Sequence, residues 1–144
     1  LYSSAASDVY KRQLGYYSNH AKQEGVPFLA QIDIPENFAG DEMDICLVLS
    51  NLLENAIEAS LKTEDSRRKI VIKMYLHHTH ILLIQAENNF DAKILEKNGV
   101  FQSTKHSGNG IGIQSIRHIT ERNGGASSFT YKDGEFMAKI MIRI

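Results

Sequence analysis

Apolar residues recur at three- and four-residue spacing along residues 41–62, and this pattern predicts a long amphipathic helix. The apolar stripe consists of Ile45, Leu49, Leu52, Leu53, Ala56 and Ile57. Asp41 follows a glycine and is a suitable N-cap, and the acidic side chains of Glu42 and Asp44 are favourable in the first turn. We therefore expect a helix that begins next to Asp41 and buries one face.

The opposite face of this helix is polar and carries two asparagines one turn apart. Asn51, Asn55, Glu58 and Lys62 fall within a few tens of degrees of one another at about 100° per residue. Asparagine is a poor helix former, so such a pair calls for an explanation. A solvated surface is one explanation. The other is ligand chemistry, in which amide oxygens hold a hydrated cation and the phosphates attached to it.

Alternation of apolar and polar residues predicts strands at residues 26–34, 69–76, 81–87, 128–131 and 136–144. The pair Asp133-Gly134 predicts a hairpin between the last two strands. Two shorter helices are expected, one ended by Gly25 and one ended by Gly124. The resulting order favours an α+β two-layer sandwich, with a mixed, mostly antiparallel sheet and its helices on one face.

The composition is that of one globular domain with a real core. The chain has 144 residues, of which 42% are hydrophobic and 23% charged, so it is not a disordered segment. A net charge of −1 argues against a general polyanion binder. The single cysteine, Cys46, allows no disulfide within the chain and favours a reducing compartment.

Residues 1–13 are small, polar and without a clear period, unlike the remainder. The stretch resembles translated adapter sequence from assembled reads, and we expect it to be disordered or irregular. The domain is then expected to cover residues 14–144, and the natural N-terminus would be missing.

A segment of about twenty residues, 88–109, shows no strong pattern and ends in a run of alternating glycines. A loop of this length in a small domain is usually functional or mobile. Gly108, Gly110 and Gly112 directly precede a predicted helix, where backbone N–H groups favour phosphate, and Lys105 stands just ahead of them. A merely flexible loop would look the same. The phosphate-binding pattern Gly-x-x-x-x-Gly-Lys-Ser/Thr is absent.

Other polar groups allow a functional or an ordinary structural explanation. Asn88 and Asn89 end a predicted strand, where an amide could pair with an adenine edge, although asparagine also favours turns. His77, His78 and His80 could suggest a metal site, but an exposed hairpin turn is the better interpretation.

Three motifs, taken together, resemble those of the GHKL ATPases. They are Asn-Leu-Leu-Glu-Asn-Ala-Ile-Glu-Ala at residues 51–59, Asn-Asn-Phe-Asp at 88–91, and Ser-Thr-Lys-His-Ser-Gly-Asn-Gly-Ile-Gly-Ile-Gln-Ser-Ile at 103–116. The resemblance is greater to the catalytic ATP-binding domain of sensor histidine kinases of the quorum-sensing, Agr-like group. It covers about residues 14–144 and implies the Bergerat ATP-binding sandwich, with ATP and Mg²⁺ as ligands.

The resemblance also implies roles by position. Asn55 matches the magnesium-binding asparagine, and Asn51 is its partner near the phosphates. Asn88 stands where most of the superfamily has an Asp that reads the adenine amino group, with Asn89 beside it. Residues 89–107 match the ATP lid, and Lys105 its phosphate-contacting lysine. The second glycine motif matches Gly108, Gly110, Ile111 and Gly112.

Two departures refine the expected function. The usual Asp-x-Gly-x-Gly motif is replaced by Asn88 and its neighbours, as is typical of the Agr-like group. Hydrolysing relatives carry a Glu base at the position of Asn51, so its absence favours phosphoryl transfer over hydrolysis, with Asn51 and Lys105 as the catalytic residues.

The implied protein is a histidine kinase that phosphorylates a histidine on a separate dimerisation helix, missing here, and acts on a response regulator. The full-length protein would be a homodimer, and this chain the cytoplasmic domain of a membrane-anchored bacterial protein. A non-enzymatic ATP-binding module and a serine kinase of the anti-sigma-factor type are the alternatives.

Overall fold

The computed structural model describes residues 8–36, 39–91, 95–97, 100–102 and 111–144, and the predicted site residues Lys105, Gly108 and Gly110 lie outside them. Its elements follow the expected order, with one short 3₁₀-helix and two short strands added. The helices are α1 (Asp8–Gln23), α2 (Glu42–Leu61), η1 (Asp65–Arg67) and α3 (Ile111–Arg122). The strands are β1 (Phe28–Asp33), β2 (Ile70–His77), β3 (Ile81–Asn89), β4 (Leu95–Lys97), β5 (Val100–Gln102), β6 (Ala126–Lys132) and β7 (Glu135–Arg143).

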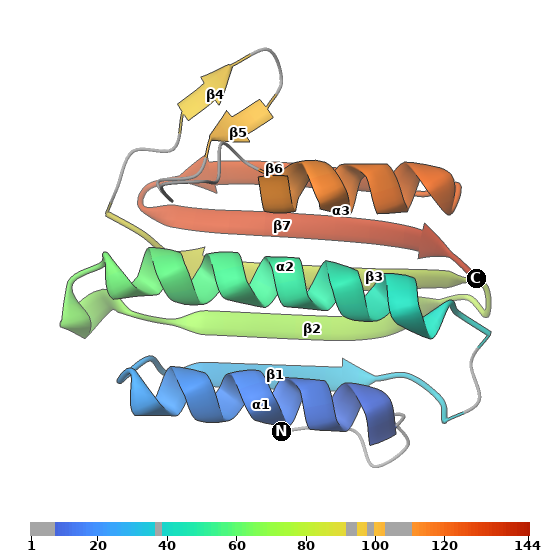
Figure 1. The fold of residues 1–144 in the computed structure, drawn as a ribbon, viewed down its shortest axis with the longest axis horizontal. Helices are drawn as coiled ribbons and strands as arrows, with labels where there is room; N and C mark the ends of the chain where they lie inside the picture. Colours follow the sequence, from blue (N-terminus) through green and yellow to red (C-terminus); the bar gives the residue numbers. More distant parts are fainter. Residues whose placement is uncertain (1–7, 37–38, 92–94, 98–99, 103–110) are drawn as a thin grey trace.

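Five of the strands form one mixed sheet in the order β1-β2-β3-β7-β6. Strands β1 and β2 are parallel, because α2 carries the chain across between them, and the other neighbours are antiparallel. All three α-helices lie on the same face of this sheet (Figure 1). The expected two-layer α+β sandwich is therefore confirmed.

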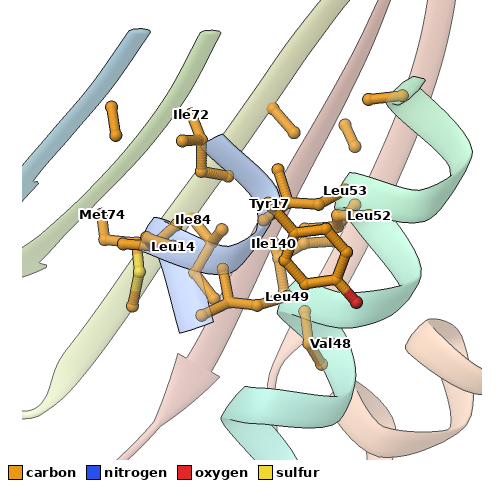
Figure 2. Close-up of a cluster of buried hydrophobic side chains, with 14 of the residues drawn as sticks. Leu14, Tyr17, Val48, Leu49, Leu52, Leu53, Ile72, Met74, Ile84 and Ile140 are labelled. Atoms are coloured by element: carbon orange, nitrogen blue, oxygen red, sulfur yellow. The ribbon is translucent and has the colours of Figure 1, made fainter. Parts of the chain in front are cut away.

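The core fills the space between the helices and the covered face of the sheet. Leu49 and Leu53 of α2 are fully buried and lie among side chains from α1 and from the central strands (Figure 2). The strand residues of this cluster are Ile72, Met74, Ile84 and Ile140. Alternate positions along each of these strands are buried, which matches the two-residue period of the sequence.

The ends of α2 follow the sequence signals. The side chain of Asp41 accepts a hydrogen bond from the backbone N–H of Asp44 at 3.0 Å, so Asp41 is the N-cap as expected. Asp44 in turn is 2.5 Å from Arg122 Nη2 and 2.9 Å from Asn123 Nδ2. These contacts join the start of α2 to the end of α3.

Residues 8–13 correct one expectation, because they are helical and form the first part of α1. Tyr10 and Leu14 are fully buried, and Gln13 Nε2 donates to the backbone oxygen of Cys46 at 2.7 Å. The buried stripe of α1 begins within residues 1–13 and consists of Tyr10, Leu14, Tyr17 and Ala21. The expectation of irregular structure is thus wrong for these six residues, while the adapter origin stays a prediction.

The expectation of a patternless segment after residue 87 is also wrong in part. Strand β3 runs on to Asn89, and β4 and β5 form a separate two-stranded sheet. Both strands have only three residues, too few to show a period in the sequence. No helix among the described residues is long and apolar enough to cross a lipid bilayer.

Candidate functional site

The two asparagines of α2 face the N-terminal turn of α3. A Cβ atom placed on Gly112 would lie 3.3 Å from Asn51 Oδ1 and 3.2 Å from Asn55 Nδ2. Gly112 is the second residue of α3. The polar face predicted for the long helix therefore meets the end of the glycine-containing stretch, and no side chain larger than that of glycine fits between them without displacement.

Asn51 has its amide oriented by its own helix. Its Nδ2 donates to the backbone oxygen of Leu47, one turn earlier, at 3.0 Å. The other amide atom, Oδ1, is the one that approaches Gly112. Both asparagines are half-buried, so neither residue is sealed inside the core.

The donor chemistry at this place suits a hard cation. Amide oxygens are ligands of Mg²⁺, which usually keeps several waters and takes further oxygens from phosphates. Among the described residues, no cluster of three or more His, Cys, Asp or Glu side chains could hold a metal ion. The amide oxygens of Asn51 and Asn55 are of the kind that a hydrated magnesium ion accepts as ligands.

The acidic residues of α2 lie elsewhere. Glu54 Oε1 accepts a hydrogen bond from the Tyr17 hydroxyl of α1 at 3.0 Å, so it faces away from Gly112. Burial is the largest cause that raises the pKa of Tyr17. Glu58 forms an ion pair with Lys62 at 3.3 Å. Neither carboxylate is placed as a general base next to the asparagines by these contacts.

Asn88 and Asn89 form a second polar group at the end of β3. Asn88 is 3% exposed and pairs in register with Ile70 of β2 and Phe136 of β7. Its Nδ2 donates to the backbone oxygen of Asn89 at 3.1 Å. A buried amide whose donor is engaged in this way presents its oxygen as the acceptor.

Thr63, just after α2, connects the helix end to the second polar group. Its hydroxyl lies 2.8 Å from the backbone oxygen of Ala59 and 3.3 Å from that of Asn89. The structure thus ties the helix that carries Asn51 and Asn55 to the strand end that carries Asn88 and Asn89.

Sequence reasoning missed how this strand end is held, because it gave no role to Glu64, to Arg67 or to Asp91 at the end of the motif at residues 88–91. Asp91 forms an ion pair with Arg67 and also accepts a hydrogen bond from the backbone N–H of Glu64 at 2.8 Å. Arg67 belongs to a charged connection in the sequence, and Asp91 follows it 24 positions later. No periodic signal relates two such positions.

The remaining residues considered in the sequence are Ile111 and the three histidines of the β2–β3 hairpin. Ile111 is the first residue of α3. The histidines of the β2–β3 hairpin lie together, with ring centroids of His77 and His78 4.2 Å apart, and all are exposed. His78 has a φ of 57°, as a tight hairpin turn requires.

Comparisons with known proteins agree with this fold. No curated protein matches the chain at a significant level. The catalytic domain of the histidine kinase ThkA matches with a TM-score of 0.73 and 19% identity, covering 94% of this chain and 92% of that one. The mycobacterial sensor histidine kinase MprB matches with a TM-score of 0.66 and 14% identity, covering 94% and 93%. Likenesses at these identities show the fold.

A complex of ThkA with the response regulator protein TrrA also matches, with a TM-score of 0.69 and 18% identity, covering 94% of this chain and 39% of that one. The sequence model of the GHKL domain matches residues 41–143, which begin at the N-cap of α2 and reach the last residue of β7. That span includes both asparagine pairs and the start of α3. By this match over most of its length, the chain belongs to the GHKL domain family.

Proposed function

We propose that this chain is the ATP-binding catalytic domain of a two-component sensor histidine kinase of the Agr-like group. It transfers the γ-phosphoryl group of ATP to a histidine on a separate dimerisation helix. The observation that carries the proposal is the approach of Gly112 to Asn51 and Asn55, at 3.2–3.5 Å from an added Cβ. This approach brings amide oxygens and the N–H groups of a helix N-terminus to one place.

The phosphate end of the ligand lies at this junction. Backbone N–H groups in the first turn of α3 carry the positive end of the helix dipole and favour phosphate. Asn55 holds the magnesium ion that accompanies the triphosphate, and Asn51 lies beside it. When bound, magnesium neutralises charge that develops on the transferring phosphoryl group. Lys105, Gly108 and Gly110 contribute to the same end.

The base end lies at the end of β3. Asn88 accepts a hydrogen bond from the adenine amino group through Oδ1, while one of the two hydrogens on its Nδ2 is held by the backbone oxygen of Asn89. Asn89 lies beside it and completes the ATP-binding set together with Ile111. A neutral amide makes a weaker hydrogen bond than a carboxylate does, so a modest ATP affinity is expected.

Transfer is favoured over hydrolysis by the residues of α2. Position 51 offers an amide, which cannot take a proton from water, and Glu54 is engaged with Tyr17. The reaction then depends on positioning and on charge stabilisation by Lys105 and the backbone N–H groups, while the nucleophile comes from the acceptor helix.

The wider setting follows from the same proposal. The ThkA complex with TrrA supports a response regulator as partner. The full-length protein is a homodimer with a membrane anchor, and this domain acts in the cytoplasm. Sensing of a quorum signal belongs to the Agr-like assignment.

Joining this chain to the dimerisation helix of a histidine kinase tests the transfer directly. The expected result, after incubation with γ-labelled ATP and Mg²⁺, is labelled protein whose phosphate is lost in acid and kept in base, as for phosphohistidine. Two controls are the fusion with Asn55→Ala and the fusion whose acceptor histidine is replaced by glutamine, and neither should become labelled.

Other outcomes identify the competing functions. ATP binding without labelling would favour a non-enzymatic nucleotide-binding module. Acid-stable phosphate on an added protein substrate would favour a serine kinase. No ATP binding at millimolar concentrations would contradict all three.

A further inference from the structure

The connection between α2 and β2 wraps around the strand end that carries Asn88 and Asn89. Asn89 Nδ2 donates to the backbone oxygen of Arg67 at 2.6 Å. Arg67 is the last residue of η1, and its own N–H donates to the backbone oxygen of Glu64 at 2.8 Å. A short helical turn therefore supplies the partner for one of the two asparagines.

The guanidinium group of Arg67 contacts Asp91, which lies two residues after the end of β3. Its Nη1 pairs with Asp91 Oδ1, while Asp91 Oδ2 accepts from the backbone N–H of Glu64. One carboxylate is thereby held at both oxygens. The side chains of Arg67 and Asp91 are 43% and 35% exposed, so the pair is open to solvent.

The hairpin between β6 and β7 closes the same cluster from the other side. Phe90 donates its N–H to the backbone oxygen of Gly134 at 2.8 Å. A Cβ on Gly134 would collide with Arg67 Nη2, and Gly134 has a φ of 76°. The guanidinium thus lies directly against Gly134, between the hairpin and the exit of β3.

We propose that Arg67 is a positioning residue for nucleotide recognition. Its guanidinium fixes Asp91 and so holds Asn88 and Asn89 in place for the base. The inference rests on the proposed function and adds a residue that the three family motifs do not contain. Arg67 acts through Asp91 and the asparagines and does not itself touch the nucleotide.

The physical reason is preorganisation. If the strand end became ordered only when the ligand binds, part of the binding free energy would be used to fix its backbone. For one residue this would lower the affinity by roughly 5- to 30-fold. A pair this exposed contributes little to global stability, so its role here is local order rather than folding.

Two variants that remove a charge isolate the ion pair. Arg67→Gln removes the guanidinium but keeps the backbone oxygen that accepts from Asn89. Asp91→Asn removes the charge but keeps an oxygen for the Glu64 N–H. We expect each to weaken Mg-ATP binding by about 5- to 10-fold, estimated from the ordering of one residue, and to lower the ratio of GTP to ATP dissociation constants.

A matched control lies in the same turn. Asp65 pairs with Arg68 at 3.0 Å, its side chain is 89% exposed, and neither residue has a described contact with Asn89 or Asp91. Asp65→Asn should leave both dissociation constants and the melting temperature unchanged. The double variant Arg67→Gln/Asp91→Asn should bind ATP about as weakly as either single variant, because both remove one interaction.

The outcomes separate this inference from the proposed function. If the wild type binds ATP and prefers it to GTP, while Arg67→Gln keeps both properties, the positioning role is wrong and the proposed function stands. If Arg67→Gln binds ATP and GTP more weakly by the same factor and its melting temperature falls, Arg67 has only a structural role. If the wild type binds no ATP, or shows no preference for it, both the base site and its positioning residue are contradicted.

Discussion

Gly112 lies so close to Asn55 that a Cβ atom added to the glycine would be 3.2 Å from Nδ2 and 3.5 Å from Oδ1 of the asparagine. The 3.2 Å contact would require the amide to give way by a few tenths of an ångström, while 3.5 Å is an ordinary contact distance. The start of α3 and the middle of α2 are therefore matched in shape at the place where the phosphates are proposed to bind.

Gly112→Ala should separate ligand binding from stability. Alanine favours a helix over glycine by about 1 kcal/mol, so the melting temperature should stay level or rise. The added methyl group must displace the amide of Asn55, so Mg-ATP affinity should fall by about tenfold, the equivalent of ~1.4 kcal/mol. Isothermal titration and thermal melting measure the two effects.

Gly15→Ala is the matched control for this substitution. Gly15 is also helical, in α1, and an added Cβ would meet nothing within 4 Å. It should raise stability and leave ATP affinity unchanged. Equal ATP affinity for Gly112→Ala and Gly15→Ala would contradict the proposed contact between Gly112 and the ligand-binding asparagine.

Gly125→Ala should destabilise the fold by overpacking. Gly125 lies between α3 and β6, and an added Cβ would overlap the backbone oxygen of Met141 in β7. Backbone cannot move aside as a side chain can, so we expect a loss of about 1–3 kcal/mol in the free energy of unfolding. Urea denaturation measures this loss.

A comparison with Gly25→Ala separates steric overlap from backbone strain. Gly25 has a φ of 72°, but an added Cβ there would meet nothing within 4 Å. That substitution should lower the free energy of unfolding by only about 1–2 kcal/mol, because alanine must adopt a left-handed backbone conformation there. A smaller loss of stability for Gly125→Ala than for Gly25→Ala would show that the backbone around Met141 moves aside, and it would contradict the predicted overpacking.

The fold could be predicted largely because its core follows simple periods. Leu49 and Leu53 repeat every four residues and Ile72 and Met74 every two, and all four are buried together. The part of α1 before residue 14 was not predicted, because Tyr10 is the only buried side chain of residues 8–13 and one apolar position shows no period. The serines and alanines at residues 3–7 add no apolar stripe.

The candidate site was predictable only where its residues belong to contiguous motifs. Asn51 and Asn55 stood out as two poor helix formers on one face, and Gly112 as part of an alternating run. The pairing of Arg67 with Asp91 did not, although Asp91 ends one of the motifs, because an ion pair between an irregular connection and a strand end is a product of the tertiary fold. No local pattern in a single sequence encodes such a pair.

Stability should fall on the alkaline side because of the thiol of α2. Burial, with a smaller contribution from the charge of Glu42, raises the pKa of Cys46. The folded state then holds a proton that the unfolded state releases, so stability is full below pH about 8.5 and is lost as pH rises through the folded pKa. Urea denaturation between pH 7 and 9.5 measures the slope.

Cys46→Ala tests the assignment of that slope. The variant should have a flatter dependence of the free energy of unfolding on pH between about 8.5 and 9.5, below the usual range in which tyrosines titrate. An unchanged slope would mean that another group carries the alkaline loss.

The most direct test of the central claim is the magnesium-dependent affinity for ATP of the wild type, Asn55→Ala and Asn19→Ala. Asn19 is exposed on α1, so its variant controls for the loss of one surface amide. The account predicts that the wild type and Asn19→Ala bind ATP more tightly with Mg²⁺ than without it, and that Asn55→Ala loses this magnesium-dependent gain, about tenfold or more, with an unchanged melting temperature. An Asn55→Ala variant that keeps the full magnesium-dependent affinity would contradict it.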